Sequence, residues 1–335
     1  MPGPRKILFI QTAFIGDAIL ASAMWEAWHA AFPEDEIHVC VRLGNEALFQ
    51  DHPFIQGLHA WEKRGRFASR YVRLIRLGRR LRQERFDAVF TPHRHVSSGV
   101  LARLTNAPIR SCFDQHPLRH WFTCTAPHDF KKGVHEVQRN HRLIEPWLDS
   151  ETASMPRLYP HSSGSIASMP EKFGVMAPAS QWATKQWPEP KWVAMCDALE
   201  DKIRCIYLVG GPGDAPLLSR IQQATRHKGV EVRSKQGLLD SAGMMQQAQW
   251  VLTNDSGPMH LASSVNAPTV AVFCSTTPDY GFGPLSSKRV VVETDLALDC
   301  KPCGLHGHIK CPKSHFDCGN RLEVERVLSA LDEVS

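Results

Sequence analysis

Short apolar runs alternate with helix-forming segments along this chain, and the alternation is interrupted once. Predicted strands lie near residues 6–10, 36–41, 87–91, 173–177, 205–210, 250–253 and 269–273. The segments between them are typical of helices, which indicates parallel sheets covered by helices. Between residues 149 and 170, turn-forming residues replace the periodicity. We therefore predict two α/β domains, 1–160 and 161–335, with a cleft between them as the expected ligand site.

The charge of the chain is concentrated in one segment. The formal net charge is +5, yet residues 61–85 carry ten basic residues against two acidic ones. This segment indicates an anionic partner: a membrane surface, a phosphorylated glycan or a nucleic acid. No stretch approaches the roughly 18 apolar residues that span a bilayer, and the run at 7–10 is too short for a signal peptide. We therefore expect a cytoplasmic protein.

The loop after the first predicted strand contains Gly16 and Asp17. Ligands of open parallel sheets bind beyond the carboxyl ends of the strands, where this loop would lie. Gly16 would allow a close approach of the backbone, and Asp17 would lie at a helix N-terminus. The alternative is that Asp17 serves only as a helix cap. A dinucleotide-binding glycine pattern is absent from this loop.

Three motifs in the second half follow predicted strands in the same way. In the segment 254–260, Pro258 suits the first turn of a helix, whose exposed amides from Ser256, Gly257 and Met259 would bind phosphate. The alternative is a capping loop with a buried His260. The other two motifs offer Ser180, Thr184 and Lys185 in one loop and Gly210, Gly211 and Asp214 in another. Here the alternatives are a solvated surface lysine and an ordinary glycine-rich turn.

Four cysteines lie close together near the end of the chain, at Cys300, Cys303, Cys311 and Cys318. Their spacing permits a four-cysteine zinc site, although the middle interval is shorter than in a typical zinc ribbon. The alternative is a lid-like loop with partly buried thiols. The other six cysteines are expected to be buried thiols in a reducing compartment.

Taken together, these motifs resemble the ADP-heptose:lipopolysaccharide heptosyltransferases of glycosyltransferase family 9, and heptosyltransferase II more than heptosyltransferase I. The resemblance rests on Gly16-Asp17, on Lys185-x-Trp187-Pro188, on Gly210-Gly211-Pro212, on the strings 254–262 and 275–280, and on the Cys300–Cys303 pair. It implies a GT-B architecture of two Rossmann-like domains whose parallel sheets face a cleft. The acceptor would bind to the first domain and the nucleotide sugar to the second.

The resemblance also implies a chemistry: transfer of heptose from ADP-heptose to the inner core of lipopolysaccharide, with inversion. Asp17, beside Gly16, would be the catalytic base. Lys185, Thr184 and the turn from Ser256 through Gly257 to Met259 would stabilise the departing ADP without a metal or a cofactor. Asp214 would contact the ribose, and Asp255 and His260 would lie near the diphosphate and the heptose. Similar cysteine tails occur in relatives not described as zinc enzymes, so no metal site is predicted.

The same resemblance assigns a partner to the basic segment. Arg70, Arg73, Arg76 and Arg80 recur at helical spacing and would dock on anionic headgroups or on the acidic sugars of the acceptor. We expect a cytoplasmic enzyme peripheral to the inner membrane, and no nucleic-acid partner, because no nucleic-acid motif accompanies the charge. Two alternatives stay open: another nucleotide-sugar donor, and a zinc-dependent module that binds anionic surfaces.

Overall fold

The computed structural model describes residues 3–130, 133–161 and 169–335, apart from the side chain of Phe67. The chain divides into two compact units, Met1–Tyr159 and Pro160–Ser335. Part of the turn-forming segment between residues 149 and 170, namely 162–168, lies outside the described residues. Among the described residues, none of the helices is both long and apolar enough to span a bilayer.

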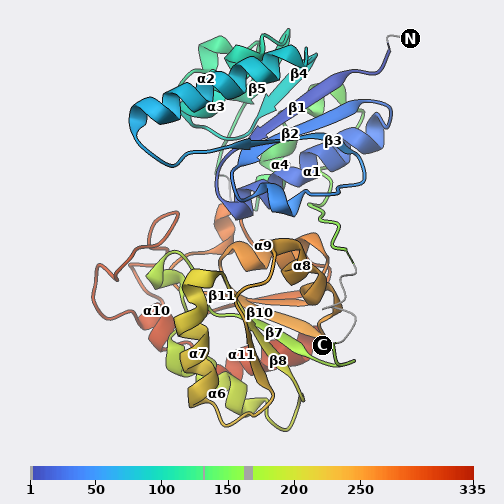
Figure 1. The fold of residues 1–335 in the computed structure, drawn as a ribbon. Coiled ribbons are helices and arrows are strands. Elements are labelled where there is room, and N and C mark those ends of the chain that lie inside the picture. The colour runs from blue at the N-terminus through green and yellow to red at the C-terminus, as the bar shows by residue number, and fades with distance from the viewer. Residues whose placement is uncertain (1–2, 131–132, 162–168) are drawn as a thin grey trace. The chain divides into compact units, whose positions relative to one another are not determined.

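The first unit is a parallel sheet with helices on both faces (Figure 1). The strand order is β3-β2-β1-β4-β5-β6. The strands are β1 (Lys6–Gln11), β2 (Glu36–Arg42), β3 (Ile55–Trp61), β4 (Ala88–Thr91), β5 (Ile109–Phe113) and β6 (Cys124–Ala126). The helices are α1 (Ile15–Ala31), α2 (Phe67–Gln83), α3 (Val96–Thr105) and α4 (Glu136–His141).

Alternation along β1 explains the two layers of this unit. Leu8 and Ile10 pack against α2 and α3 in one hydrophobic cluster, whereas Phe9 contacts Trp25 and Trp28 of α1 on the opposite face. Successive side chains of a strand point to opposite faces, so a continuous apolar run needs cover on both sides.

The second unit repeats the strand order of the first. Its sheet runs β12-β11-β10-β7-β8-β9 and is parallel throughout. The strands are β7 (Gly174–Ala177), β8 (Ile206–Val209), β9 (Val230–Arg233), β10 (Trp250–Asn254), β11 (Thr269–Phe273) and β12 (Arg289–Glu293). The helices are α6 (Glu189–Ala198), α7 (Ala215–Ala224), α8 (Leu238–Gln247), α9 (Gly257–Ser264), α10 (Asp317–Asn320) and α11 (Val324–Val334).

In both units the fourth strand lies beside the first and on the opposite side from the second. The order therefore reverses between β1 and β4 in one sheet and between β7 and β10 in the other. This is the Rossmann strand order, and the crevice at such a reversal is where open α/β sheets bind ligands. The loops after these four strands are therefore the first places to look for a site.

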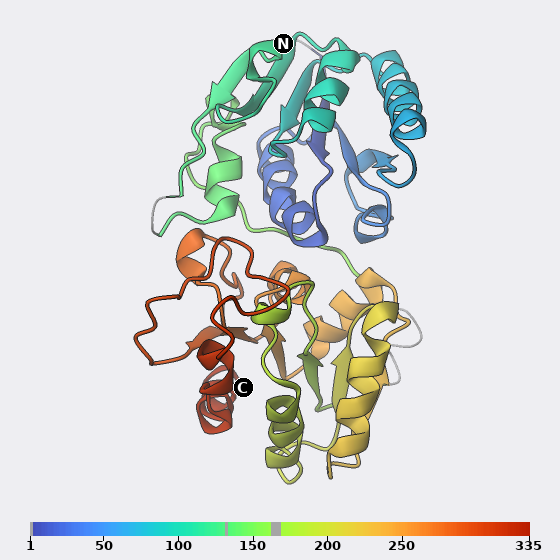
Figure 2. The same cartoon turned by 90° about the vertical axis from the view of Figure 1, so that its left-hand side faces the viewer.

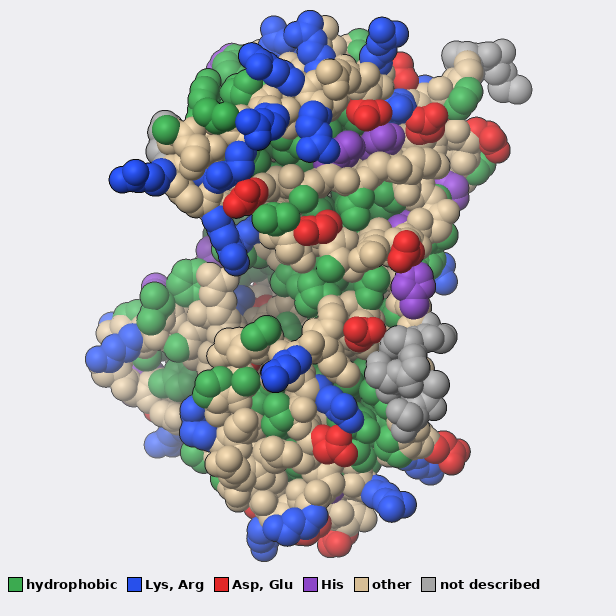
Figure 3. Space-filling view, viewed as in Figure 1, with side chains coloured by type: hydrophobic (Ala, Val, Ile, Leu, Met, Phe, Trp, Pro, Cys, Tyr) green, Lys and Arg blue, Asp and Glu red, His purple; other side chains and the backbone are tan. Residues whose placement is uncertain are grey.

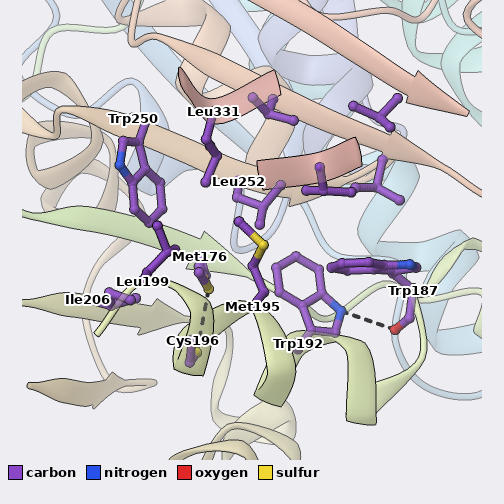
Figure 4. Packing of buried hydrophobic residues seen from close by; sticks show 14 of the residues in the cluster. Met176, Trp187, Trp192, Met195, Cys196, Leu199, Ile206, Trp250, Leu252 and Leu331 are labelled. Atoms are coloured by element: carbon purple, nitrogen blue, oxygen red, sulfur yellow. Dashed lines mark hydrogen bonds between the residues drawn. The ribbon is translucent and has the colours of Figure 1, made fainter. Parts of the chain in front are cut away.

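A large apolar cluster fixes the second sheet to α6 and α11 (Figure 4). Met176, Leu252 and Leu331 contribute aliphatic contacts to it. The indole N–H of Trp187 donates to the Leu322 carbonyl at 3.1 Å, and that of Trp192 donates to the Trp187 carbonyl at 3.0 Å. The buried indole of Trp187 thus anchors the loop after β7 to the core, and its N–H is hydrogen-bonded.

The predictions from periodicity were right for the central strands and incomplete at the edges. The outer strands β3, β6, β9 and β12 were missed, as was β5. The helix-like pattern of residues 134–148 does not form one helix, because α4 ends at His141 and a separate 3-10 turn follows at Glu145–Trp147. The segment 44–51 forms only the 3-10 turn Glu46–Leu48. Strands at a sheet edge are half-exposed and carry a weaker apolar pattern.

We predict that Gly174→Ala destabilises the second unit by about 1–3 kcal/mol. Gly174 pairs across the sheet with Trp250, and an added Cβ would lie 2.2 Å from the Trp250 ring. Urea unfolding followed by tryptophan fluorescence would measure the loss. The matched control is Gly213→Ala, where an added Cβ has no heavy atom within 4 Å. Combining Gly174→Ala with Trp250→Phe, whose ring is smaller, should restore part of the stability. Equal losses of stability in Gly174→Ala and Gly213→Ala would contradict this explanation.

Candidate functional site

An ion pair lies at the strand-order reversal of the second unit. Lys185, in the loop after β7, places its Nζ 2.6 Å from Oδ2 of Asp255, the residue that follows β10. The hydroxyl of Thr276, after β11, donates to the same oxygen at 2.6 Å. Asp255 is only 5% exposed, and a buried carboxylate needs such partners. Three loops that are far apart in sequence therefore meet at one carboxylate.

A second set of hydrogen bonds fixes these loops to one another. The buried Asn254 accepts the Trp187 backbone N–H at 3.0 Å and donates its side-chain amide to the Pro178 carbonyl at 2.7 Å. The hydroxyl of Ser275 donates to that of Thr184 at 3.1 Å. Thr184 and Ser275 are both buried. These contacts hold Lys185 in place beyond the carboxyl ends of the central strands β7 and β10.

The turn at 256–259 begins helix α9 as predicted, but its residues differ in solvent exposure. Ser256 is the extended N-cap residue, and Gly257 begins the helix. The first amides of a helix lack intrahelical acceptors and favour anions. Met259 is fully buried and its N–H donates to the Ser256 carbonyl at 3.1 Å. The Met259 N–H therefore already has an acceptor within the turn, and its contact with phosphate stays a prediction. His260 is buried as well.

The glycine-rich turn after β8 is built around Asp214. Its Oδ2 accepts the Gly211 N–H at 2.8 Å, and an added Cβ at Gly210 would lie 2.9 Å from the Asp214 Cβ. Ser180, in the loop after β7, is half-buried and its carbonyl accepts the Gln186 side-chain amide at 2.6 Å. These residues lie at neighbouring strand ends, since β7 pairs with β8. Within the described residues, Asp214 makes no direct hydrogen bond to Lys185 or Asp255.

In the first unit, Asp17 lies in the first turn of α1, directly after Gly16. The N-cap position belongs to Phe14, whose backbone N–H donates to Asp17 Oδ2 at 3.2 Å. The alternative in which Asp17 is the N-cap is therefore wrong: Asp17 is the third residue of the helix, and its carboxylate accepts the N–H of the N-cap residue. Burial raises the pKa of Asp17 to about 6, and the charge of Glu136 adds to the rise. The Phe14 N–H and Arg94 act in the opposite direction.

Glu136 keeps its charge because His128 and Arg139 hold it. Burial alone would raise its pKa, but His128 and Arg139 lower it below its usual value. The Arg139 Nε lies 2.7 Å from Glu136 Oε2, and the His128 Nε2 lies 3.3 Å from the same atom. Helices α4 and α1 pack against each other. Asp17 therefore lies next to a fixed negative charge, which makes it a stronger base.

Basic groups surround Asp17 at the strand ends of this sheet. Burial and the nearby Arg42 and Arg70 together lower the pKa of Lys63 to about 8, with Asp17 acting in the opposite direction. The Arg42 guanidinium lies over the Phe14 ring at 5.5 Å. His93, after β4, lies 3.0 Å from the Thr12 hydroxyl. Asp17 thus has basic side chains as well as the Glu136 carboxylate near it, an arrangement that suits proton removal from an anionic molecule.

The four arginines predicted to share a docking face divide into two groups. Arg70 and Arg73 are half-buried, and the Arg73 Nε lies 3.3 Å from Glu62 Oε2. Arg76 and Arg80 are exposed. Basic side chains gather over the part of the molecule that carries α2 (Figure 3). Arg70 thus belongs with Lys63 near Asp17, and the exposed arginines form an outer surface.

The cysteine-rich segment holds free thiols. Cys300, Cys303 and Cys311 are half-buried and Cys318 is buried. The Cys300 Sγ lies 3.8 Å from His315 Nε2. In the part of the chain that the structure describes, His, Cys, Asp and Glu side chains do not form a group of three or more arranged to hold a metal ion. Of the other six cysteines, five are buried and Cys124 is half-buried.

Sequence reasoning missed Ser275 and Thr276 as site residues, although both directly follow a predicted strand. It also missed Lys63, Arg94 and Glu136 around Asp17. Glu136 precedes no motif and lies 119 residues from Asp17. No local pattern marks such a residue.

Comparison with known sequences agrees with these features. A family model described as glycosyltransferase family 9 (heptosyltransferase) matches residues 74–309. Lipooligosaccharide heptosyltransferase 2 of Haemophilus influenzae is 24% identical over 316 residues, which cover 86% of this chain and 88% of that protein.

Comparison with solved structures supports the fold. The structure of Escherichia coli ADP-heptose lps heptosyltransferase II matches with a TM-score of 0.80 at 19% identity, covering 98% of both chains. A glycosyl transferase family 9 protein from Veillonella parvula matches with a TM-score of 0.81 at 20% identity, covering 99% of this chain and 98% of its own. The predicted α/β class with two Rossmann-like domains is confirmed.

We predict that Asp17→Asn stabilises the protein at pH 7.5 and not at pH 4. The folded-state pKa near 6 lies above that of an unfolded Asp, so the folded protein binds the proton more tightly. Wild-type stability therefore falls as pH rises from about 4 to 6. Asparagine carries no charge, so the variant avoids this loss of stability, which is on the order of 2 kcal/mol. Its side-chain carbonyl still accepts the hydrogen bond from the Phe14 N–H. Thermal unfolding at both pH values, with the exposed Asp201→Asn as control, would measure it. Destabilisation at pH 7.5 would contradict the raised pKa.

Proposed function

The chain belongs to glycosyltransferase family 9, the heptosyltransferase family, and we propose from that membership that it transfers heptose from ADP-heptose to the inner core of lipopolysaccharide. The observation that carries the proposal is the pair of clusters at equivalent strand-order reversals. One presents a held lysine beside a helix N-terminus. The other presents a single carboxylate of raised pKa among cations.

The first unit would bind the acceptor. Asp17 would accept the proton of the attacking hydroxyl as its oxygen forms a bond to the anomeric carbon of heptose. A base with a pKa near 6 is largely ionised at neutral pH, yet it binds a proton better than an ordinary carboxylate. The basic residues around it suit an acceptor that carries carboxylates or phosphates, as inner-core sugars do.

The second unit would bind the nucleotide sugar. As the bond from the anomeric carbon to the β-phosphate breaks, ADP leaves with the electron pair and its negative charge grows. Lys185 and the first turn of α9 would stabilise that charge, so we propose that the reaction needs no metal or other cofactor. Asp255 and Thr276 hold Lys185 in place. Ser180 and Asp214, at neighbouring strand ends, would contact the rest of the nucleotide.

The proposal is tested with a panel of nucleotide sugars and defined acceptors bearing acidic inner-core sugars on lipid A. ADP-heptose should be the best donor, turnover should survive EDTA, and Asp17→Asn should lower kcat by about 100- to 10,000-fold. The wild-type kcat/KM should rise with pH through about 6 as Asp17 ionises. Faster transfer from a UDP- or GDP-sugar would contradict the donor assignment, and near-normal turnover by Asp17→Asn would contradict the base.

We also propose that the exposed arginines of α2 hold the enzyme on the anionic cytoplasmic face of the inner membrane, where the lipid-linked acceptor lies. Arg76, Arg79, Arg80 and Arg82 are exposed on this helix, and Tyr71 and Val72 at its start are each 55% exposed. Basic residues near an anionic surface contribute about 1 kcal/mol each.

Replacing Arg76, Arg79 and Arg82 together with Gln should reduce co-sedimentation with vesicles containing 30% phosphatidylglycerol by about tenfold or more. Their charges face solvent, so the fold should be unaffected. The matched control replaces Arg220, Arg226 and Arg233 of the second unit, which should leave binding unchanged. Equal losses in both triple variants would mean that the binding reflects only net charge.

A further inference from the structure

A segment between β12 and α10 approaches the Lys185–Asp255 pair within the second unit. Residues 294–316 form the long orange-red loop of that unit (Figure 2). We call residues 303–308 of this loop the strap.

Both ends of the strap are fixed by backbone hydrogen bonds to site residues. The Cys303 N–H donates to the Ser275 carbonyl at 2.7 Å. The Thr184 N–H donates to the His308 carbonyl at 3.0 Å, and the His308 N–H donates to the Thr184 hydroxyl at 2.7 Å. Thr184 directly precedes Lys185. The strap is therefore held against the same loops that position the ion pair.

Gly307 lets the strap come this close. Its φ is +72°, which favours glycine. An added Cβ would lie 2.9 Å from the Thr184 hydroxyl oxygen, 3.0 Å from that of Ser275 and 3.3 Å from Cγ of Lys185. The strap backbone thus packs directly on three residues of the candidate site.

His306 precedes this contact and lies within electrostatic range of the ion pair. It is exposed overall, but desolvation of its ring and the Lys185 ammonium lower its pKa, and the Asp255 carboxylate opposes them. The lowered pKa favours the neutral imidazole, which keeps one N–H donor. A bound diphosphate would accept a hydrogen bond from that N–H.

We propose that the strap forms one wall of the donor site and that His306 hydrogen-bonds the β-phosphate of the bound nucleoside diphosphate. This rests on the proposed function only in taking a nucleoside diphosphate as the leaving group. His306 then adds to Lys185 and α9 a third group that binds the diphosphate. His306 would contact only the phosphates, and other residues would recognise the nucleotide base.

Calorimetric titration with ADP and with AMP tests the proposal, because AMP lacks the β-phosphate. His306→Ala should weaken ADP about tenfold and change AMP less than about twofold, without lowering the melting temperature. His306→Gln, which keeps a hydrogen-bond donor, should restore most of the ADP affinity. The matched control is Ile309→Ala, directly after the strap, whose side chain is 79% exposed, and it should bind ADP normally.

An equal loss for ADP and AMP, an equal loss in the two alanine variants, or a lower melting temperature of His306→Ala would each overturn the proposal. The first two would indicate a general effect of the strap, and the third a structural role. If wild-type protein prefers another base, the proposed donor fails while this proposal remains testable. The same comparison is then made with UDP and UMP, or with GDP and GMP.

Discussion

The buried amide of Asn254 is the contact on which the candidate donor site depends. It links the end of β10 to the loop after β7 by accepting from Trp187 and donating to Pro178. Trp187 in turn is fixed below by its indole bond to the Leu322 carbonyl. Lys185 and Asp255 lie beside these anchors in the two loops. Their 2.6 Å pairing therefore follows from the packing of the core rather than from their mutual attraction alone.

Sequence reasoning could find residues that directly follow strands, because the carboxyl ends of parallel strands meet at one edge. Asp17, Lys185 and Asp255 were found in this way. The strap could not be found, since 124 residues separate His308 from Thr184 and its sequence has no periodicity. Helical spacing placed Arg70 and Arg73 on one face with Arg76 and Arg80, but spacing cannot show that Arg70 and Arg73 are half-buried or that Arg73 pairs with Glu62.

The two units share one strand order, but the charges at their strand-order reversals are arranged in opposite ways. At the reversal between β1 and β4, basic side chains lie around a carboxylate of raised pKa. At the reversal between β7 and β10, a carboxylate holds a cation beside a helix N-terminus. The strand order provides the position in both cases, and the side chains after the strands provide the chemistry.

The repeated strand order has an evolutionary consequence. Each unit has its own six-stranded sheet and its own hydrophobic core, so substitutions in one unit leave the folding free energy of the other largely unchanged. Mutations that alter the strand-end loops of one unit can accumulate without unfolding the other. Such a protein can diversify its products by altering half of its chain at a time.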